Sequence, residues 1–215
     1  MHFFLEVDGV VCHEKARYWH AYCEAVAQVG LARTDEVSFW RAIRTGAGAD
    51  RLLQQAKPHH LLRFAQAFEA SLESPESIAL LSPHDGVADW LSRLGHRDRC
   101  TFFSTGRFLD GRSSVLGRLG LPGAERGETV ALERAIDAAG CDGAHVMLVA
   151  QRASANKCAA ADLRTVGIAS GSCIAKRLAG AGALAVYRDL DAFAQAMDQC
   201  ADELVRMGLV LGRTT

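Results

Sequence analysis

Two short groups of polar residues in this sequence could take part in chemistry, and each of them follows an apolar segment. Glu6 and Asp8, separated by a single residue, come directly after an apolar run at the N-terminus. Ser104, Thr105 and Gly106 end a second apolar segment, where they offer a hydroxyl and backbone N–H groups near the expected start of a helix. Such donors bind anions, whereas the two carboxylates repel them. The sequence therefore predicts an anion site that two acidic side chains oppose.

The composition is that of a globular protein with no strong charge of either sign. The 215 residues include 49% hydrophobic and 23% charged side chains, with 24 Lys and Arg against 25 Asp and Glu, and the formal net charge is −1. A chain of this length can bury roughly 70% of the surface that it exposes when unfolded. The near-neutral charge argues against a protein dedicated to nucleic acids or to membrane surfaces. We expect neither kind of partner.

The cysteines and the apolar runs indicate where such a chain is expected to work. No apolar run reaches the roughly 20 residues that a membrane-spanning helix needs, and no secretory signal peptide is expected. The seven cysteines are scattered and form no C-x-x-C pair, which is typical of a reduced, cytoplasmic chain. His20 and Cys23 share a helical face, but nothing in the sequence identifies a second pair of zinc ligands. We predict a cytoplasmic location and no metal site.

A block of helical spacing follows the N-terminal apolar run. Apolar side chains recur there at every third or fourth position, which is the spacing of one helix face. A Gly-rich stretch and Pro58 divide the block into separate helices. The three stripes are Tyr18, Tyr22 and Val26; Phe39 and Ile43; and Leu61, Phe64, Phe68 and Leu72. We predict an all-helical insert.

After residue 83, short apolar segments alternate with helical ones, which predicts right-handed βαβ units and a parallel sheet. A parallel sheet binds its ligands at the carboxyl ends of the strands, so Glu6, Asp8 and Ser104 are expected at one edge, together with residues 150–155. The expected strands after the insert are residues 100–104, 146–150, 165–169 and 184–187. The expected helices are residues 87–94, 109–119, 130–139, 156–161 and 173–179, and a final one carrying Phe193, Met197, Cys200 and Leu204.

These segments resemble the motifs of the haloacid dehalogenase (HAD) superfamily, in its phosphatase-like branch with a helical cap after the first strand. The family's first motif, an apolar strand followed by D-x-D-G, is similar to Leu5-Glu6-Val7-Asp8-Gly9-Val10. Its second motif, a strand that ends in Ser or Thr, is similar to Phe102-Phe103-Ser104-Thr105-Gly106. The resemblance implies an α/β fold, a three-layer Rossmannoid core with a parallel sheet over residues 1–13 and 83–215. It also implies an α-helical cap over residues 14–82.

The resemblance also implies roles for individual residues. In this family the first aspartate attacks phosphorus, and the second protonates the leaving group and later activates water. Glu6 stands at the place of the first and Asp8 at the place of the second. Ser104 stands at the place of the hydroxyl that holds the phosphoryl oxygens, and Arg126 at the place of the lysine that neutralises them. A G-D-x-x-x-D segment completes the family's Mg²⁺ site.

This sequence departs from the family at the decisive positions. Glu6 places its carboxylate one methylene further out, and a misplacement of about 1 Å can cost on the order of a hundredfold in rate. The segment 149–155 occupies the place of G-D-x-x-x-D and contains no carboxylate, although Mg²⁺ prefers oxygen ligands in octahedral geometry. We therefore expect no Mg²⁺ and no other cofactor. Few residues separate the preceding helix from Arg126, which predicts a shortened or missing edge strand there.

Two classes of function remain open. The first is a HAD-like protein with degenerate motifs, a pseudoenzyme that binds a small phosphorylated or anionic molecule, or a protein partner, without efficient hydrolysis. The second is an active phosphomonoester hydrolase in which Glu6 and Asp8 carry the chemistry. We favour the first because two independent parts of the catalytic set are altered. Glu6 is as readily interpreted as a structural carboxylate bonded to backbone N–H groups. Dinucleotide binding is disfavoured, since no strand precedes a G-x-G-x-x-G segment.

Overall fold

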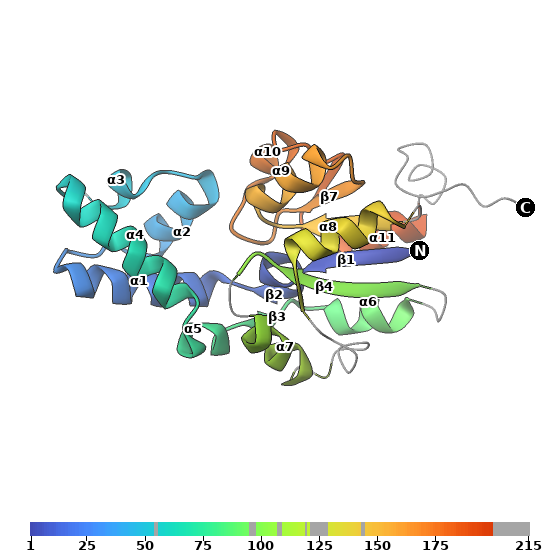
Figure 1. Cartoon of the computed structure of the whole chain (residues 1–215), viewed down its shortest axis with the longest axis horizontal. Coiled ribbons are helices and arrows are strands. Elements are labelled where there is room, and N and C mark those ends of the chain that lie inside the picture. Colours follow the sequence, from blue (N-terminus) through green and yellow to red (C-terminus); the bar gives the residue numbers. More distant parts are fainter. Residues whose placement is uncertain are drawn as a thin grey trace, which may run out of the picture.

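The computed structural model of the chain describes residues 1–53, 56–94, 98–106, 109–118, 120, 129–142 and 145–199. A six-stranded parallel sheet with the order β5-β4-β1-β6-β7-β8 forms its centre (Figure 1). This arrangement confirms the predicted α/β fold. The strands are β1 His2–Glu6, β4 Arg99–Ser104, β5 Val130–Ala131, β6 His145–Val149, β7 Thr165–Ile168 and β8 Ala185–Tyr187.

Helices cover both faces of the sheet and give the three layers. Successive side chains of β1 enter different cores, because they alternate between the two faces of a strand. Phe3 and Leu5 pack with side chains of α6, α7 and α11, whereas Phe4 packs with side chains of α8, α9 and α10. These helices are α6 Val87–Arg93, α7 Leu109–Arg118, α8 Leu132–Gly140, α9 Arg152–Ala160, α10 Ala175–Ala179 and α11 Leu190–Gln199.

The chain turns sharply where β1 ends. A single wide turn, η1 Val7–Val11, follows the strand, and within it Gly9 has a φ of 91° that favours glycine. A Cβ at Gly9 would lie 2.7 Å from the Cβ of Ala150 and 3.0 Å from the Cα of Gly171. The turn is therefore fixed between two other loops, and this fixes the direction of the Asp8 side chain.

Five helices lie between the two short strands β2 Cys12–His13 and β3 Ser82–Pro83, which pair antiparallel. They are α1 Lys15–Val29, α2 Glu36–Thr45, α3 Ala49–Leu52, α4 Pro58–Leu72 and α5 Pro75–Ala79. Figure 1 shows α1 to α4 gathered at one end, beside the sheet. The predicted stripes form their core, where the Tyr22 and Phe39 rings stack at 4.4 Å and Phe64 packs edge-on against Tyr22. The helical insert is thus confirmed, and its exact boundaries, 14 and 82, stay a prediction that the β2–β3 pair supports.

Several element boundaries differ from the predicted ones, among them the starts of α8 and α9. Val130 and Ala131 were assigned to a helix, but they form the edge strand β5, which pairs with the end of β4, and the helix begins at Leu132. The shortened or missing edge strand is predicted before Arg126, at residues 121–125, which lie outside the described residues, whereas β5 comes after Arg126. The helix expected from residue 156 begins at Arg152. Cys200 and Leu204 lie outside the described residues.

Within the part of the chain that the structure describes, no helix is both long and apolar enough to cross a bilayer.

Candidate functional site

Glu6 is the last residue of β1, and its side chain is fully buried against the segment between β6 and α9. Its Oε2 accepts hydrogen bonds from the N–H of Ala150 at 2.8 Å and of Gln151 at 3.1 Å. Its Oε1 accepts a hydrogen bond from Ser154 Oγ at 2.5 Å. Gln151 precedes α9 and provides no side-chain cap of its own. Glu6 therefore caps the N-terminus of α9 from the neighbouring strand, because it accepts hydrogen bonds from donors that the helix leaves unpaired.

The surroundings of Glu6 also change its protonation. Burial raises the pKa of Glu6 to about 8, although the hydrogen bonds from Ser154 and Ala150 act in the opposite direction. The negative charges of Glu14 and Asp8 raise this pKa further. The carboxyl group is thus mostly protonated near pH 7, and a protonated acid is a poor nucleophile.

Asp8 points elsewhere, toward two guanidinium groups. Arg17 Nη1 lies 3.1 Å from Asp8 Oδ1, and Arg112 Nη2 lies 3.0 Å from Asp8 Oδ2. Arg112 Nε donates a further hydrogen bond to Oδ2 at 3.0 Å, and Ser104 Oγ donates a longer one at 3.4 Å. The side chains of Asp8, Arg17 and Arg112 are only 1–3% exposed. Protein donors therefore surround Oδ2 of the predicted acid/base, whereas Oδ1 faces Arg17 and accepts no hydrogen bond among the described residues.

Glu73, at the end of α4, completes the arrangement. Arg17 Nη2 donates to Glu73 Oε1 at 3.0 Å, and Arg112 donates from Nη1 to Oε2 at 2.9 Å and from Nη2 to Oε1 at 3.1 Å. We call Asp8, Arg17, Glu73 and Arg112 the charge cluster. Arg17 and Glu73 belong to the helical insert, whereas Asp8 and Arg112 lie next to the sheet. The cluster is therefore a buried ionic connection between these two parts.

The predicted anion donors meet at the end of β4, but some of them already have partners. The N–H of Gly106 donates to Ser104 Oγ at 3.0 Å, and the hydroxyl of Thr105 donates to Gln151 Oε1 at 3.2 Å. A Cβ at Gly106 would lie 2.2 to 2.4 Å from three atoms of the Arg112 guanidinium, which therefore rests against this backbone. Arg112 is the cation beside the turn. The predicted cation, Arg126, lies outside the described residues.

A third buried carboxyl group, Glu14, precedes α1. It accepts a hydrogen bond from the N–H of Ser172, and its Oε2 has no hydrogen-bond partner among the described residues. Burial, together with the negative charge of Asp8, raises the pKa of Glu14 to about 7. The group adds negative charge to this region only when it is deprotonated.

Sequence reasoning missed Arg17, Glu73 and Arg112, although a signal was present for the two arginines. Arg112 stands three and four positions before two fully buried residues of α7, Val115 and Leu116. Side chains at this spacing share a helix face, so Arg112 had to be buried and required a partner. Arg17 stands in the same relation to the buried Ala21 of α1. Glu73 gave no comparable signal.

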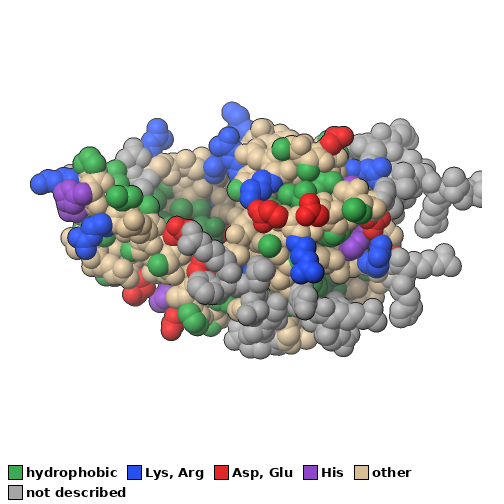
Figure 2. Space-filling model, in the orientation of Figure 1, with side chains coloured by type: hydrophobic (Ala, Val, Ile, Leu, Met, Phe, Trp, Pro, Cys, Tyr) green, Lys and Arg blue, Asp and Glu red, His purple; other side chains and the backbone are tan. Residues whose placement is uncertain are grey.

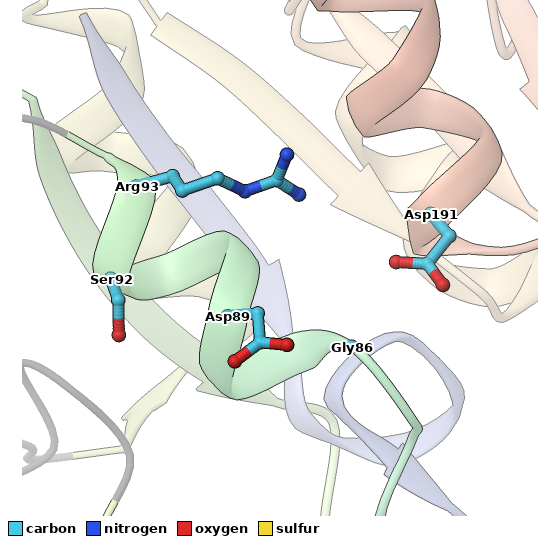
Figure 3. A pocket seen from close by; sticks show the side chains of 5 residues that line it. All are labelled: Gly86, Asp89, Ser92, Arg93 and Asp191. Atoms are coloured by element: carbon cyan, nitrogen blue, oxygen red, sulfur yellow. The ribbon is translucent and has the colours of Figure 1, made fainter.

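The surface also has a hollow that is separate from this site. It is lined by Gly86, Asp89, Ser92, Arg93 and Asp191, on α6 and at the start of α11 (Figure 3). No residue of the predicted site lines it. On the face drawn in Figure 2, acidic and basic side chains are interspersed over α8 and α9, in keeping with the formal net charge of −1.

Solved structures with the same fold are HAD-like hydrolases and phosphatases. A hydrolase from Pseudomonas syringae aligns with 93% of this chain and 99% of its own, with a TM-score of 0.65 and 16% identity. A HAD-like family hydrolase from Streptococcus pneumoniae aligns with 90% and 97%, with a TM-score of 0.67 and 10% identity. A predicted phosphoglycolate phosphatase from Haemophilus somnus aligns with 91% and 96%, with a TM-score of 0.64 and 13% identity. No protein-family model and no curated protein matches the sequence. The chain thus has the HAD-like fold.

The described residues do not fit the Mg²⁺ ion that the resemblance implies. Glu6 is bonded to the α9 loop and Asp8 to two guanidinium groups, which would repel a divalent cation. Among the described residues, no three His, Cys, Asp or Glu side chains are grouped so that they could hold a metal ion. Gln151 and Ser154, at the place of the family's metal-binding segment, are neutral and are bonded to other groups.

Proposed function

We propose that this chain binds a small anionic or phosphorylated molecule at the carboxyl ends of β1 and β4, without efficient Mg²⁺-dependent hydrolysis. The observation that carries the proposal is that both carboxyl groups at the catalytic positions are bonded within the protein. Glu6 is held by backbone and hydroxyl donors, and Asp8 by two guanidinium groups. A carboxylate nucleophile has to be deprotonated and free to approach phosphorus, and Glu6 meets neither condition.

Anion binding has support of its own. Arg17, Arg112 and the hydroxyl of Ser104 bring positive charge and a hydrogen-bond donor to the carboxyl end of β4. Several proteins of the same fold are described as phosphatases, one of them a predicted phosphoglycolate phosphatase, and this favours a phosphorylated small molecule as the ligand.

The hydrolysis part is tested with a chromogenic phosphomonoester and Mg²⁺. We expect activity near background, and a turnover of about 1 s⁻¹ or more would reject the proposal in favour of an active phosphatase that uses Glu6 and Asp8. Glu6→Asp alone should not create activity, because the metal ligands are still missing. Activity should require carboxylates at Gln151 and at Ala155 or Ser154 as well. Glu133→Gln, at an exposed position on α8, is the matched control.

The binding part is tested by thermal unfolding with phosphate esters and organic acids in the presence of EDTA. A ligand at about 100 times its Kd stabilises the folded state by about 2.7 kcal/mol, which is a shift of a few degrees for a chain of this size. Ser104→Ala should reduce the shift, and Arg126→Ala tests the predicted cation. An unchanged melting temperature across the panel would contradict anion binding, and a protein partner would then be the better account.

A further inference from the structure

The two arginines of the charge cluster converge on a carboxylate that belongs to the protein itself. Arg112 contacts the two oxygens of Glu73 end-on, with Nη1 at 2.9 Å from Oε2 and Nη2 at 3.1 Å from Oε1. Arg17 Nη2 donates to the same Oε1 at 3.0 Å. This paired geometry is the one in which a guanidinium recognises a planar carboxylate. The same three donors would recognise such a group on a small molecule.

Glu73 is the member of the cluster that can leave. Its side chain is 11% exposed, whereas those of the other three members are 1–3% exposed. It ends α4 and is followed directly by Ser74, which caps α5, so it stands in a connection between two helices. Asp8, in contrast, lies in the turn that is packed around Gly9. Turning the Glu73 side chain outward would break no helical or sheet hydrogen bond.

The charges of the cluster determine what would replace Glu73. Two guanidinium groups face two carboxylates, so these four groups balance. When Glu73 turns outward, the two guanidinium groups lose one of the carboxylates that they face, and the loss of a partner by a buried charge is costly. An entering anion restores the balance. The site lies beside the β4 turn, because the Arg112 guanidinium rests against Gly106.

We propose that Arg17 and Arg112 form the site for a carboxylate group of a small ligand, and that Glu73 fills this site as an internal competitor. The inference rests on the proposed function, and it names the cations and the ligand group. In this inference Arg17 and Arg112, and not Arg126, are the main cations that recognise the anion. The ligand has to displace Glu73, so the wild-type affinity is lower than the arginine pair alone would give.

The experiment uses the full chain and malonate as the probe, measured by calorimetry and thermal unfolding at constant ionic strength with chloride as the reference salt. Glu73→Ala removes the competitor, and Glu73→Gln removes its charge while keeping its size. Both should bind malonate about tenfold more tightly than the wild type, since a charge-assisted hydrogen bond no longer has to be broken. Glu76→Gln, at an exposed residue three positions along the chain, should bind like the wild type.

The arginines are tested in the variant without the competitor. Glu73→Ala combined with Arg112→Gln removes one charge of each sign, so the double variant leaves Asp8 opposite Arg17 and should fold. It should lose the gain in malonate affinity, and Glu73→Ala with Arg17→Gln should lose part of it. Equal affinity in the wild type and in both Glu73 variants would overturn the inference. Binding that survives Arg112→Gln, or a gain for inorganic phosphate without one for malonate, would do the same.

The outcomes separate this inference from the proposed function. If wild-type binding of anions depends on Ser104 or Arg126, but not on Glu73 or Arg112, the proposed function stands and the inference is wrong. If Glu73→Ala binds malonate and the wild type binds no anion of the panel, the inference stands and the proposed function is wrong.

Discussion

Glu6 and Asp8 are separated by one residue, yet the structure uses them in opposite ways. Glu6 is held by neutral donors, the backbone N–H groups of Ala150 and Gln151 before α9 and the hydroxyl of Ser154 in α9. Asp8 is held by two cations, one from the helical insert and one from α7. Glu6 therefore stabilises the interior of the core, and Asp8 stabilises the junction between the core and the helical insert. The two carboxyl groups at the positions that the resemblance gives to the catalytic aspartates therefore have separate sets of partners within the protein.

The largest effect on stability is expected from disrupting the charge cluster, which connects the core to the helical insert. Arg112→Ala leaves Asp8 and Glu73 without their shared cation, and removing one partner of a buried ion pair costs about 3 to 5 kcal/mol. Urea unfolding measures this loss. Adding Glu73→Ala should recover part of it, because one charge of each sign is then absent. Arg93→Ala removes an exposed pair with Asp198 at 3.5 Å and should change stability by less than about 1 kcal/mol. Equal effects at Arg112 and Arg93 would contradict the described cluster.

A smaller effect on stability is expected from removing one of the hydrogen bonds to Glu6 in the core. Ser154→Ala removes the hydroxyl that donates to Glu6 Oε1, and an underbonded buried polar group costs about 1 to 3 kcal/mol. The backbone bonds to Glu6 remain, so the loss should be smaller than at Arg112. Ser92→Ala, in an exposed hydroxyl-to-carbonyl bond on α6, serves as the control in the same urea titration. A loss at Ser154 no greater than at Ser92 would show that Glu6 does not depend on this donor.

Much of the fold could be predicted from the sequence, because it depends on patterns that are local. The apolar run of β1 and the helical stripe of α1 each identify their element within a few residues. The charge cluster could not be predicted, because Arg112 lies 104 positions from Asp8 and 39 from Glu73, and Arg17 lies 56 positions from Glu73. The role of Glu6 could not be decided from the sequence for the same reason, because its partners lie 144 to 148 positions away, just before α9 and in its first turn. No local pattern connects that segment to β1.

A further expected effect is a pH dependence of stability that comes from Glu6. The raised pKa of about 8 means that folded Glu6 holds its proton more tightly than the unfolded chain does. Stability is therefore lost as the pH rises from about 4.5 to 8. His84 acts oppositely below pH 6.5, because burial lowers its pKa to about 4, so we choose the window from pH 6.5 to 8. Glu14, with a pKa of about 7, contributes in the same direction as Glu6.

Denaturant titrations across that window measure the slope. Each of the two carboxyl groups lowers stability by up to about 1.4 kcal/mol per pH unit where the folded form still holds its proton and the unfolded form has lost it. Glu6→Gln should remove the contribution of Glu6 to the slope of stability against pH, and Glu14→Gln should remove the contribution of Glu14. Glu133→Gln, at an exposed position, should leave this slope unchanged. A slope that rises with pH in the wild type would contradict the buried, protonated state of Glu6.

The most direct test of the account is a crystal structure of the chain grown with Mg²⁺ and phosphate. The account predicts that Asp8 stays between Arg17 and Arg112, that Glu6 stays on the N–H groups of Ala150 and Gln151, and that no Mg²⁺ lies beside either carboxyl group. A Mg²⁺ ion coordinated by Asp8, with Glu6 turned toward a bound phosphate, would contradict the account and favour an active phosphatase.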